Sequence, residues 1–183
     1  TYLPAFKKLV MDAKVEAVMG AYNRTLDEPC CGSKLLLEDI LRGEWGFEGH
    51  VVSDCGALSD FHLNHKVTKD AAETVALALK RGCDIGCDHV YSEIPEAITR
   101  GLITEADVDH ALERTLGTRF KLGMFDPVED VPFASIEMEV VACDAHRQLA
   151  YRAATESVVL LKNKNNILPI KPSAKKIFVS GAT

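Results

Sequence analysis

The stretch HVVSDCGA, residues 50–57, decides the fold. Val51 and Val52 are β-branched, and the apolar run gives way at once to Ser53, Asp54 and a Cys-Gly pair. A short apolar segment that opens into a polar, glycine-containing loop is typical of a buried strand. We therefore predict a strand of a parallel sheet here, with Asp54 at its carboxyl end.

Helical and apolar segments alternate on both sides of this strand. Upstream we predict a helix over 2–14, a strand over 15–22 (VEAVMGAY), a loop over 23–33 and a helix over 34–47. Downstream we predict a helix that is capped by Thr68 and ends at Gly82, a strand at 83–88 (CDIGCD), and helix over 92–122 broken near Gly101. Three successive βα units predict an α/β fold with a parallel sheet, and a (β/α)₈ barrel in particular. A Rossmann-like sheet has a similar pattern, but GxGxxG is absent.

The pattern changes after residue 125. Residues 126–135 (DPVEDVPFAS) contain proline and acidic residues without periodicity, which is typical of a linker. A helix over 144–157, a strand VVLLK (158–162), a polar turn, the segment ILPI and a last strand KIFVSGA (176–182) follow. A sheet that stops after its first strands has an unpaired edge, so we expect the natural domain to continue.

Composition narrows the class of partner. The 183 residues carry 21 Lys and Arg against 27 Asp and Glu, a net charge of −6, so we expect neither nucleic acid nor an anionic membrane as partner. A neutral ligand such as a sugar fits this balance. No apolar run approaches the length of a membrane span, and the first residues lack the apolar core of a signal peptide.

The six cysteines do not form a recognisable metal motif. They stand at positions 30, 31, 55, 83, 87 and 143, without the C-x-x-C pairs of a zinc ribbon. Buried free thiols are the ordinary interpretation. A Cys/His site with His62, His65 or His89 is conceivable, but its spacing matches no closed zinc motif, and we predict neither metal nor cofactor.

Asp54 is the best candidate for chemistry. Catalytic groups of parallel α/β folds lie at the carboxyl ends of strands, and three such ends are expected, at residues 19–24, 53–56 and 86–89. Ser53 and Gly56 flank Asp54 and let a ligand approach a fixed carboxylate. The alternative is an Asx turn or a helix cap after the strand.

Four ordered motifs resemble those of glycoside hydrolase family 3. They are AYNRTLDEP (21–29), LLLEDILRGEWGFEGHVVSDCGAL (35–58), GLITEADVDHALERTLGTRFKLGMFD (101–126) and ESVVLLKNKNNILPI (156–170), which together extend over nearly the whole chain. The resemblance implies the last βα units of a barrel over 1–125, a linker over 126–143, and the beginning of an α/β sandwich domain over 144–183. It also implies that the chain is a fragment, because the family's Lys-His sugar-binding strand should precede residue 1.

The resemblance further implies a retaining β-glycosidase without cofactor, of the β-xylosidase or β-glucosidase type, that acts on oligosaccharides or on aryl and alkyl β-glycosides. Asp54 matches the family's nucleophile, Tyr22 the tyrosine beside it, and Met19 a position that lines the sugar site, although a core role is an alternative for Tyr22 and Met19. DCGAL together with EPCCGS favours the xylosidase-like branch. The family's acid/base glutamate usually lies in the second domain, and no glutamate of this chain is a candidate for it.

Several alternatives stay open from the sequence. The chain could be a non-catalytic piece that binds sugar or a partner, or belong to another barrel hydrolase or lyase with Asp54 as general base. The strands that deliver Cys55 and Cys87 are expected to be neighbours, so these thiols could approach each other, while a disulfide depends on the compartment. The resemblance favours a periplasmic or secreted protein, but the start of the natural chain is not identified.

Overall fold

The computed structural model describes residues 1–173, 175, 176, 178 and 180. The chain divides into two compact units, Thr1–Pro132 and Phe133–Thr183. Each unit is described by itself below.

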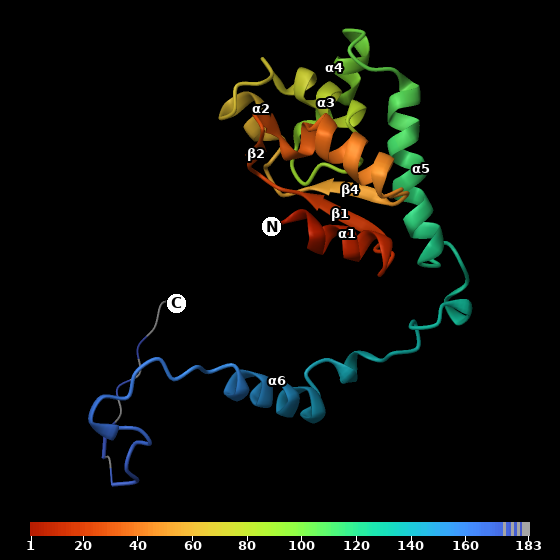
Figure 1. The fold of residues 1–183 in the computed structure, drawn as a ribbon. Helices are drawn as coiled ribbons and strands as arrows, with labels where there is room; N and C mark the ends of the chain where they lie inside the picture. Colours follow the sequence, from red (N-terminus) through yellow and green to blue (C-terminus); the bar gives the residue numbers. More distant parts are fainter. Residues whose placement is uncertain (174, 177, 179, 181–183) are drawn as a thin grey trace. The chain divides into compact units, whose positions relative to one another are not determined.

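Two parallel strands form the centre of the first unit. Strand β1 (Ala17–Gly20) pairs in parallel with β4 (His50–Ser53), in a register that places Val18 opposite Val51 and Met19 opposite Val52. They lie side by side in Figure 1. The parallel βα arrangement predicted from the sequence is therefore present, although β1 is shorter than the predicted strand over 15–22.

Helices make up most of the rest of the first unit. In chain order they are α1 (Leu3–Met11), the π-helix η2 (Lys34–Glu44), α2 (Ser59–Leu63), α3 (Ala71–Lys80), α4 (Ile94–Thr99) and α5 (Glu105–Lys121), with 3₁₀ turns at Cys30–Gly32, Val90–Glu93 and Val128–Asp130. The predicted helical break near Gly101 is confirmed, because this glycine has a φ of +67° between α4 and α5. The predicted loop over 23–33 contains a short antiparallel hairpin, β2 (Arg24–Thr25) with β3 (Glu28–Pro29).

The predicted cap of α3 is wrong by two residues. The Asp70 side chain accepts a hydrogen bond from the Glu73 amide at 2.9 Å and caps the helix, whereas the Thr68 hydroxyl lies 2.7 Å from that of Thr74. A carboxylate at the N-cap satisfies a free amide of the first turn and also interacts favourably with the helix dipole. The predicted end at Gly82, with a φ of +85°, is confirmed.

The predicted strand over 83–88 is reduced to a single bridge. Only Ile85 pairs with the sheet, in parallel with Val52. Next to it, Asp84 turns its side chain inward, where one carboxylate oxygen accepts the Val51 amide at 2.8 Å. The Asp84 side chain therefore takes the Val51 amide, a donor that a regular strand ladder would use. No described residue pairs with the other edge of residues 83–88.

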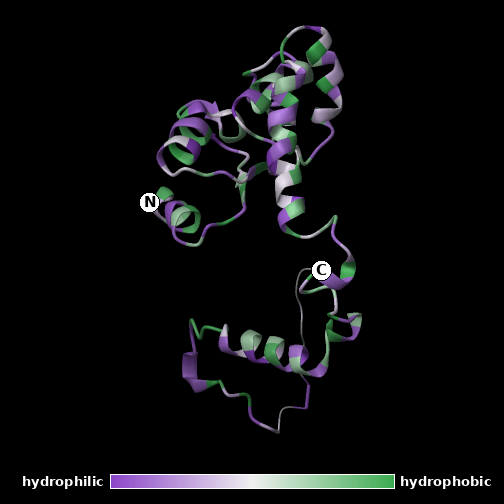
Figure 2. Cartoon of the chain, turned by 90° about the vertical axis from the view of Figure 1, so that its right-hand side faces the viewer, coloured by the Kyte–Doolittle hydropathy of each residue, from purple (hydrophilic) through white to green (hydrophobic). Residues whose placement is uncertain are grey.

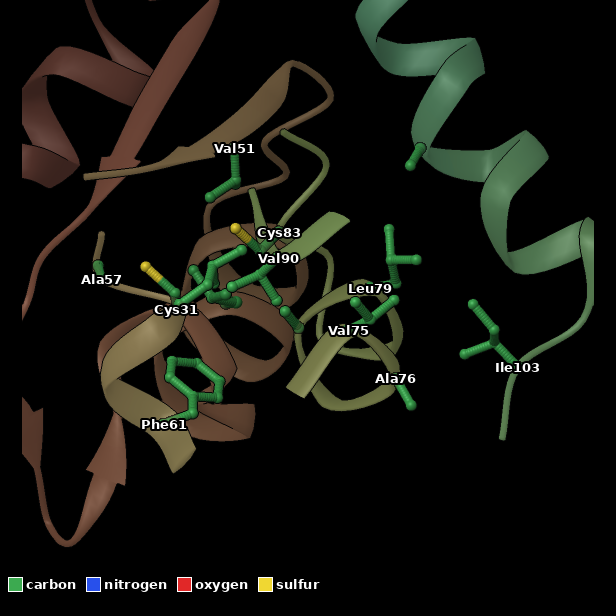
Figure 3. Packing of buried hydrophobic residues seen from close by; sticks show 14 of the residues in the cluster. Cys31, Val51, Ala57, Phe61, Val75, Ala76, Leu79, Cys83, Val90 and Ile103 are labelled. Atoms are coloured by element: carbon green, nitrogen blue, oxygen red, sulfur yellow. The ribbon is translucent and has the colours of Figure 1, made fainter. Parts of the chain in front are cut away.

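A continuous core fills the space between the strands and the helices. Val51, Phe61 and Val75 are almost fully buried, and Figure 3 shows their side chains in one cluster with the free thiols of Cys31 and Cys83. These two cysteines thus have the buried structural role expected from the sequence.

No residue in the described part of the second unit belongs to such a core. Its helix α6 (Asp144–Glu156) agrees with the predicted helix over 144–157 but has no buried residue, and 3₁₀ turns occur at Met138–Val140 and Lys164–Asn166. The predicted strand over 158–162 is wrong, since these residues are extended without a strand partner in the described part of the unit. The predicted strand over 176–182 falls largely on residues outside those described.

Apolar side chains remain exposed in both units. Figure 2 shows hydrophobic and hydrophilic residues around the same helices, and the exposed set includes Leu3, Phe6 and Leu9 of α1 and Leu149 of α6. Within the described residues, no helix is both long and apolar enough to cross a membrane.

Candidate active site

Asp54 stands directly after β4, on backbone that is fixed from both sides. Its amide donates to the Gly20 carbonyl at 2.9 Å and so extends the hydrogen bonding between the two strands, while its carbonyl accepts the Ala57 amide at 3.1 Å. Gly20 also lets Cys31 pack against the end of β1, because a Cβ at this position would lie 2.4 Å from the Cys31 sulfur. Figure 1 shows α2 and β2 at the end toward which both strand arrows point.

The Asp54 carboxylate is half-buried and only partly engaged. Its Oδ1 accepts the amide of Cys55 at 2.7 Å, and no side chain of the described residues donates to either oxygen. A local side-chain to backbone bond is therefore present, as the Asx-turn interpretation expected. It uses one oxygen and leaves the other available for a ligand.

The neighbouring strand end is joined to the residues around Asp54 by three hydrogen bonds and a disulfide. The Ser53 amide donates to the Ile85 carbonyl at 2.8 Å, and the Gly56 amide donates to the Cys87 carbonyl at 3.1 Å. The Cys87 amide donates to the Ser53 hydroxyl at 2.9 Å. Cys55 and Cys87, whose bonding the sequence left open, form a disulfide with 4.3 Å between the Cα atoms. The residue after Asp54 is therefore covalently joined to the end of the neighbouring segment, and we call these two linked loops, residues 54–57 and 86–88, the rim.

Tyr22 comes from the loop after β1 and approaches the loop of Asp54. A Cβ added to Gly56, which has a φ of +87°, would lie 3.2 Å from the Tyr22 hydroxyl oxygen. No hydrogen bond joins this hydroxyl to Asp54 in the described structure. Partial desolvation, followed by the negative charge of Asp54, raises the pKa of Tyr22, so the phenol keeps its proton and remains a donor.

Met19 lies on β1 with 56% of its surface exposed. Its register partner is Val52, whereas Val18 pairs with the fully buried Val51 and packs against the core. Because side chains alternate between the faces of a strand, Met19 is on the face turned away from the core. Met19 is therefore exposed in this unit, and its role in lining a sugar site stays a prediction.

Two carboxylates near the site were not singled out by the sequence analysis. Asp60 and Asp88 both raise the pKa of Tyr22, after desolvation and Asp54. Asp88 accepts from the Ser59 amide at 3.2 Å, the Ser59 hydroxyl at 3.3 Å and the Val90 amide at 3.0 Å, which fixes it as a structural acceptor. The only feature of the sequence that could have pointed to Asp88 is its position at the third expected strand end, residues 86–89.

A buried ion network supports the opposite end of β4. Asp84 accepts from Arg42 and Arg114, each at 2.9 Å, and its side chain is 1% exposed. Arg42 also donates to the carbonyls of Phe47, Gly49 and Gly82. Desolvation lowers the pKa of Arg42, and the charge of Asp84 opposes that change. The network anchors β4 beneath Asp54.

No metal centre accompanies these residues. Within the described part of the chain, no group of three or more His, Cys, Asp or Glu side chains could hold a metal ion. Glu28 accepts a hydrogen bond from the Ser33 hydroxyl at 2.7 Å, and Glu44 forms an ion pair with the Lys7 ammonium at 2.9 Å. These partners give each of them a structural explanation.

Comparison with known proteins identifies the family. The model of the glycosyl hydrolase family 3 N-terminal domain matches residues 1–117. The chain belongs to glycosyl hydrolase family 3. This family 3 chain is 48% identical over 183 residues to a xylan 1,4-β-xylosidase of Xylanibacter ruminicola, and 45% identical over 174 residues to a probable exo-1,4-β-xylosidase of Aspergillus clavatus.

Solved structures agree with this assignment. A family 3 exo-β-xylosidase in complex with a xylobiose aziridine probe is similar over 94% of the chain, with a TM-score of 0.83 and 32% identity. A β-glucosidase from Erythrobacter marinus is similar over 92%, with a TM-score of 0.78 and 35% identity. The two alignments with the curated relatives include 99% and 93% of this chain. They include only 21% and 22% of the relatives, and the structural matches include 22% of each solved chain.

Proposed function

We propose that this chain supplies the nucleophile of a retaining β-glycosidase, and that the nucleophile is Asp54. The observation that carries the proposal is a half-buried carboxylate at the end of β4, with one oxygen held by the Cys55 amide and the other available. Rigid placement at a strand end is what a nucleophile needs, because the attacking atom must be held near the reacting carbon before reaction.

The reaction would proceed in two displacements. An oxygen of Asp54 attacks the anomeric carbon, the glycosidic C–O bond breaks, and a carboxylic acid from outside this chain gives its proton to the departing oxygen. In the second displacement that group, now a carboxylate, removes a proton from water, and the water oxygen replaces Asp54 on the sugar. Asp54 returns as a carboxylate, so the anomeric configuration is retained.

Tyr22 and Met19 would line the same sugar site. The raised pKa of Tyr22 keeps its hydroxyl protonated, so it can donate to Asp54 or to a sugar oxygen once substrate is bound. Met19 offers an exposed apolar surface on the strand that precedes Tyr22. Apolar surface combined with a few fixed polar groups is the usual composition of a ligand site.

For the parent enzyme we propose a substrate with a β-linked xylose or glucose. The two curated relatives and one of the solved structures above are named as β-xylosidases, and the other as a β-glucosidase. Residues 1–125 would form the last βα units of a (β/α)₈ barrel, 126–143 a linker and 144–183 the beginning of an α/β sandwich domain. The exposed apolar residues of α1 and α6 support this, since neighbouring parts would cover them.

Mass spectrometry of a trapped intermediate tests the proposal. The full-length protein would be incubated with 2-fluoro xylosyl and 2-fluoro glucosyl fluorides, which form slowly hydrolysed glycosyl-enzyme esters, and then digested and mapped. We expect the label on Asp54. Asp54→Ala should lower kcat by at least about 10³-fold with the fold intact, because the covalent step is lost.

Other outcomes would identify the alternatives. Turnover without any label, together with inversion of the anomeric configuration seen by NMR, would make Asp54 a general base. Sugar binding without turnover would make the protein a non-catalytic sugar-binding member. Label on another carboxylate would contradict the assignment of Asp54 directly.

A further inference from the structure

A hydrogen-bonded link joins the loop after β1 to the segment after α2. The Nε2 of His65 lies 2.9 Å from the Tyr22 carbonyl oxygen. Because a carbonyl can only accept, the ring nitrogen is the donor and carries the proton. In return, Arg24 Nη1 donates to the His65 carbonyl at 3.4 Å. Residues on both sides of Asn23 are thus connected to His65.

His65 is itself held on the segment that carries Asp54. Its amide donates to the Asp60 carbonyl at 2.7 Å, at the end of α2, and the amide of Asn64 donates to the same carbonyl at 3.0 Å. Helix α2 begins five residues after Asp54, at Ser59, and the Ser59 amide is fixed by Asp88. The link therefore connects the two loops that carry Tyr22 and Asp54.

Tyr22 has no side-chain anchor of its own. Its hydroxyl forms no hydrogen bond within the described structure, and the residue is 44% exposed. The side chain nevertheless stands over Gly56, where a Cβ would come within 3.2 Å of the hydroxyl oxygen. The orientation of the ring therefore depends on the backbone of Tyr22, and His65 is the side chain that holds this backbone.

We propose that His65 is a positioning residue for the reaction, which acts through the Tyr22 backbone to hold the phenol beside Asp54. The inference rests on the proposed function, since it assigns Tyr22 a role in the chemistry at Asp54. His65 touches neither substrate nor reacting atoms in this role. Its contribution is to keep Tyr22 in one orientation before substrate arrives, so that no freedom of the loop is lost in the transition state.

Two matched amide variants test the link in the full-length protein. His65→Gln keeps an amide donor at about the reach of Nε2, whereas His65→Asn carries the same group one methylene shorter and cannot reach the carbonyl. We expect His65→Asn and His65→Ala to lower kcat by about 5- to 30-fold with little change in KM, and His65→Gln to stay within about threefold of wild type. His110→Ala, at an exposed position of α5, is the control and should be silent. Equal activity of the Gln and Asn variants would overturn the proposal.

A double-mutant cycle separates positioning from a general structural effect. Tyr22→Phe removes the hydroxyl, so in that background His65→Asn should lower kcat by less than about twofold further. Independent, multiplicative effects would overturn the proposal even if both single variants are slow. Labelling of Asp54 by the 2-fluoro reagent is scored separately. Its failure would reject the proposed nucleophile, whereas an absence of coupling in a correctly labelled enzyme would reject only the role of His65.

Discussion

The two units of this chain use similar local sequence signals but differ in how far their described residues are buried. In the first unit, β1 and β4 pair and helices cover them, so that residues such as Val51 and Val75 are fully buried. In the second unit, α6 is a regular helix, yet none of its residues is buried. Helix formation needs only local bonds and a suitable sequence, whereas a strand and a core need partners from distant parts of the chain.

The largest expected loss of stability comes from breaking the buried ion pairs of Asp84, and breaking the exposed ion pair of Asp144 serves as the comparison. Asp84→Ala leaves Arg42 and Arg114 without their buried partner and should cost about 3–5 kcal/mol in local stability of the first unit. Asp144→Ala removes the exposed pair with Arg147 in α6 and should cost less than about 1 kcal/mol. Hydrogen exchange of the Ser53 amide, which donates to the Ile85 carbonyl rather than to Asp84, measures the first effect in the full-length protein, and exchange of the α6 amides measures the second. Similar losses would contradict the comparison.

The disulfide gives the next largest expected effect. Cys55 and Cys87 are separated by 32 residues, and a loop of this size is worth roughly 3–4 kcal/mol through the entropy of the unfolded chain. The double variant Cys55→Ser, Cys87→Ser should therefore lower the denaturant midpoint of the first unit. Cys143→Ser, which alters a free cysteine of the second unit, should leave it unchanged. Unaltered stability of the double variant would mean that the rim is fixed by its backbone hydrogen bonds alone.

A matched pair of leucines tests the cores directly. Leu79 of α3 is 7% exposed, whereas Leu149 of α6 is 55% exposed. Leu79→Ala should cost about 2–3 kcal/mol, because it removes buried methyl groups and leaves a cavity. Leu149→Ala in the isolated chain should be nearly neutral. In the full-length protein, a cost above about 1 kcal/mol for Leu149→Ala would show that another part of the enzyme covers this face.

The smallest expected effect concerns the cap of α3. Asp70→Ala should lower the thermal midpoint by a few degrees at most, and Thr68→Ala by clearly less. Hydrogen bonds from the Glu73 amide and Arg100 lower the pKa of Asp70 below its usual 3.8. A lowered folded pKa means that the contribution is complete above 3.8 and is lost as the pH falls through the lowered value. Thermal unfolding at pH 7 and at pH 2.5 should therefore show a smaller difference between wild type and Asp70→Ala at the lower pH.

Much of the first unit could be predicted because its signals are local. The β-branched run at Val51, the glycines at 82 and 101 and the periodicity of the helices predict the correct element types in the correct order. Asp54 also stands at the end of a strand, as its neighbours indicated. The cap at Asp70 and the hairpin at 24–29 were missed, since several polar residues compete locally for each of these roles.

What the sequence determined by itself is therefore the family, the order of the βα elements and the position of Asp54 after a parallel strand. Only the tertiary structure decided that Cys55 reaches Cys87, that Asp84 turns inward to two arginines, and that His65 holds the backbone of Tyr22. The same is true of residues 158–162, which have strand-like composition but no strand partner among the described residues. Local preference selects helix or strand, but pairing and burial depend on residues that are far apart in sequence and meet only in the fold.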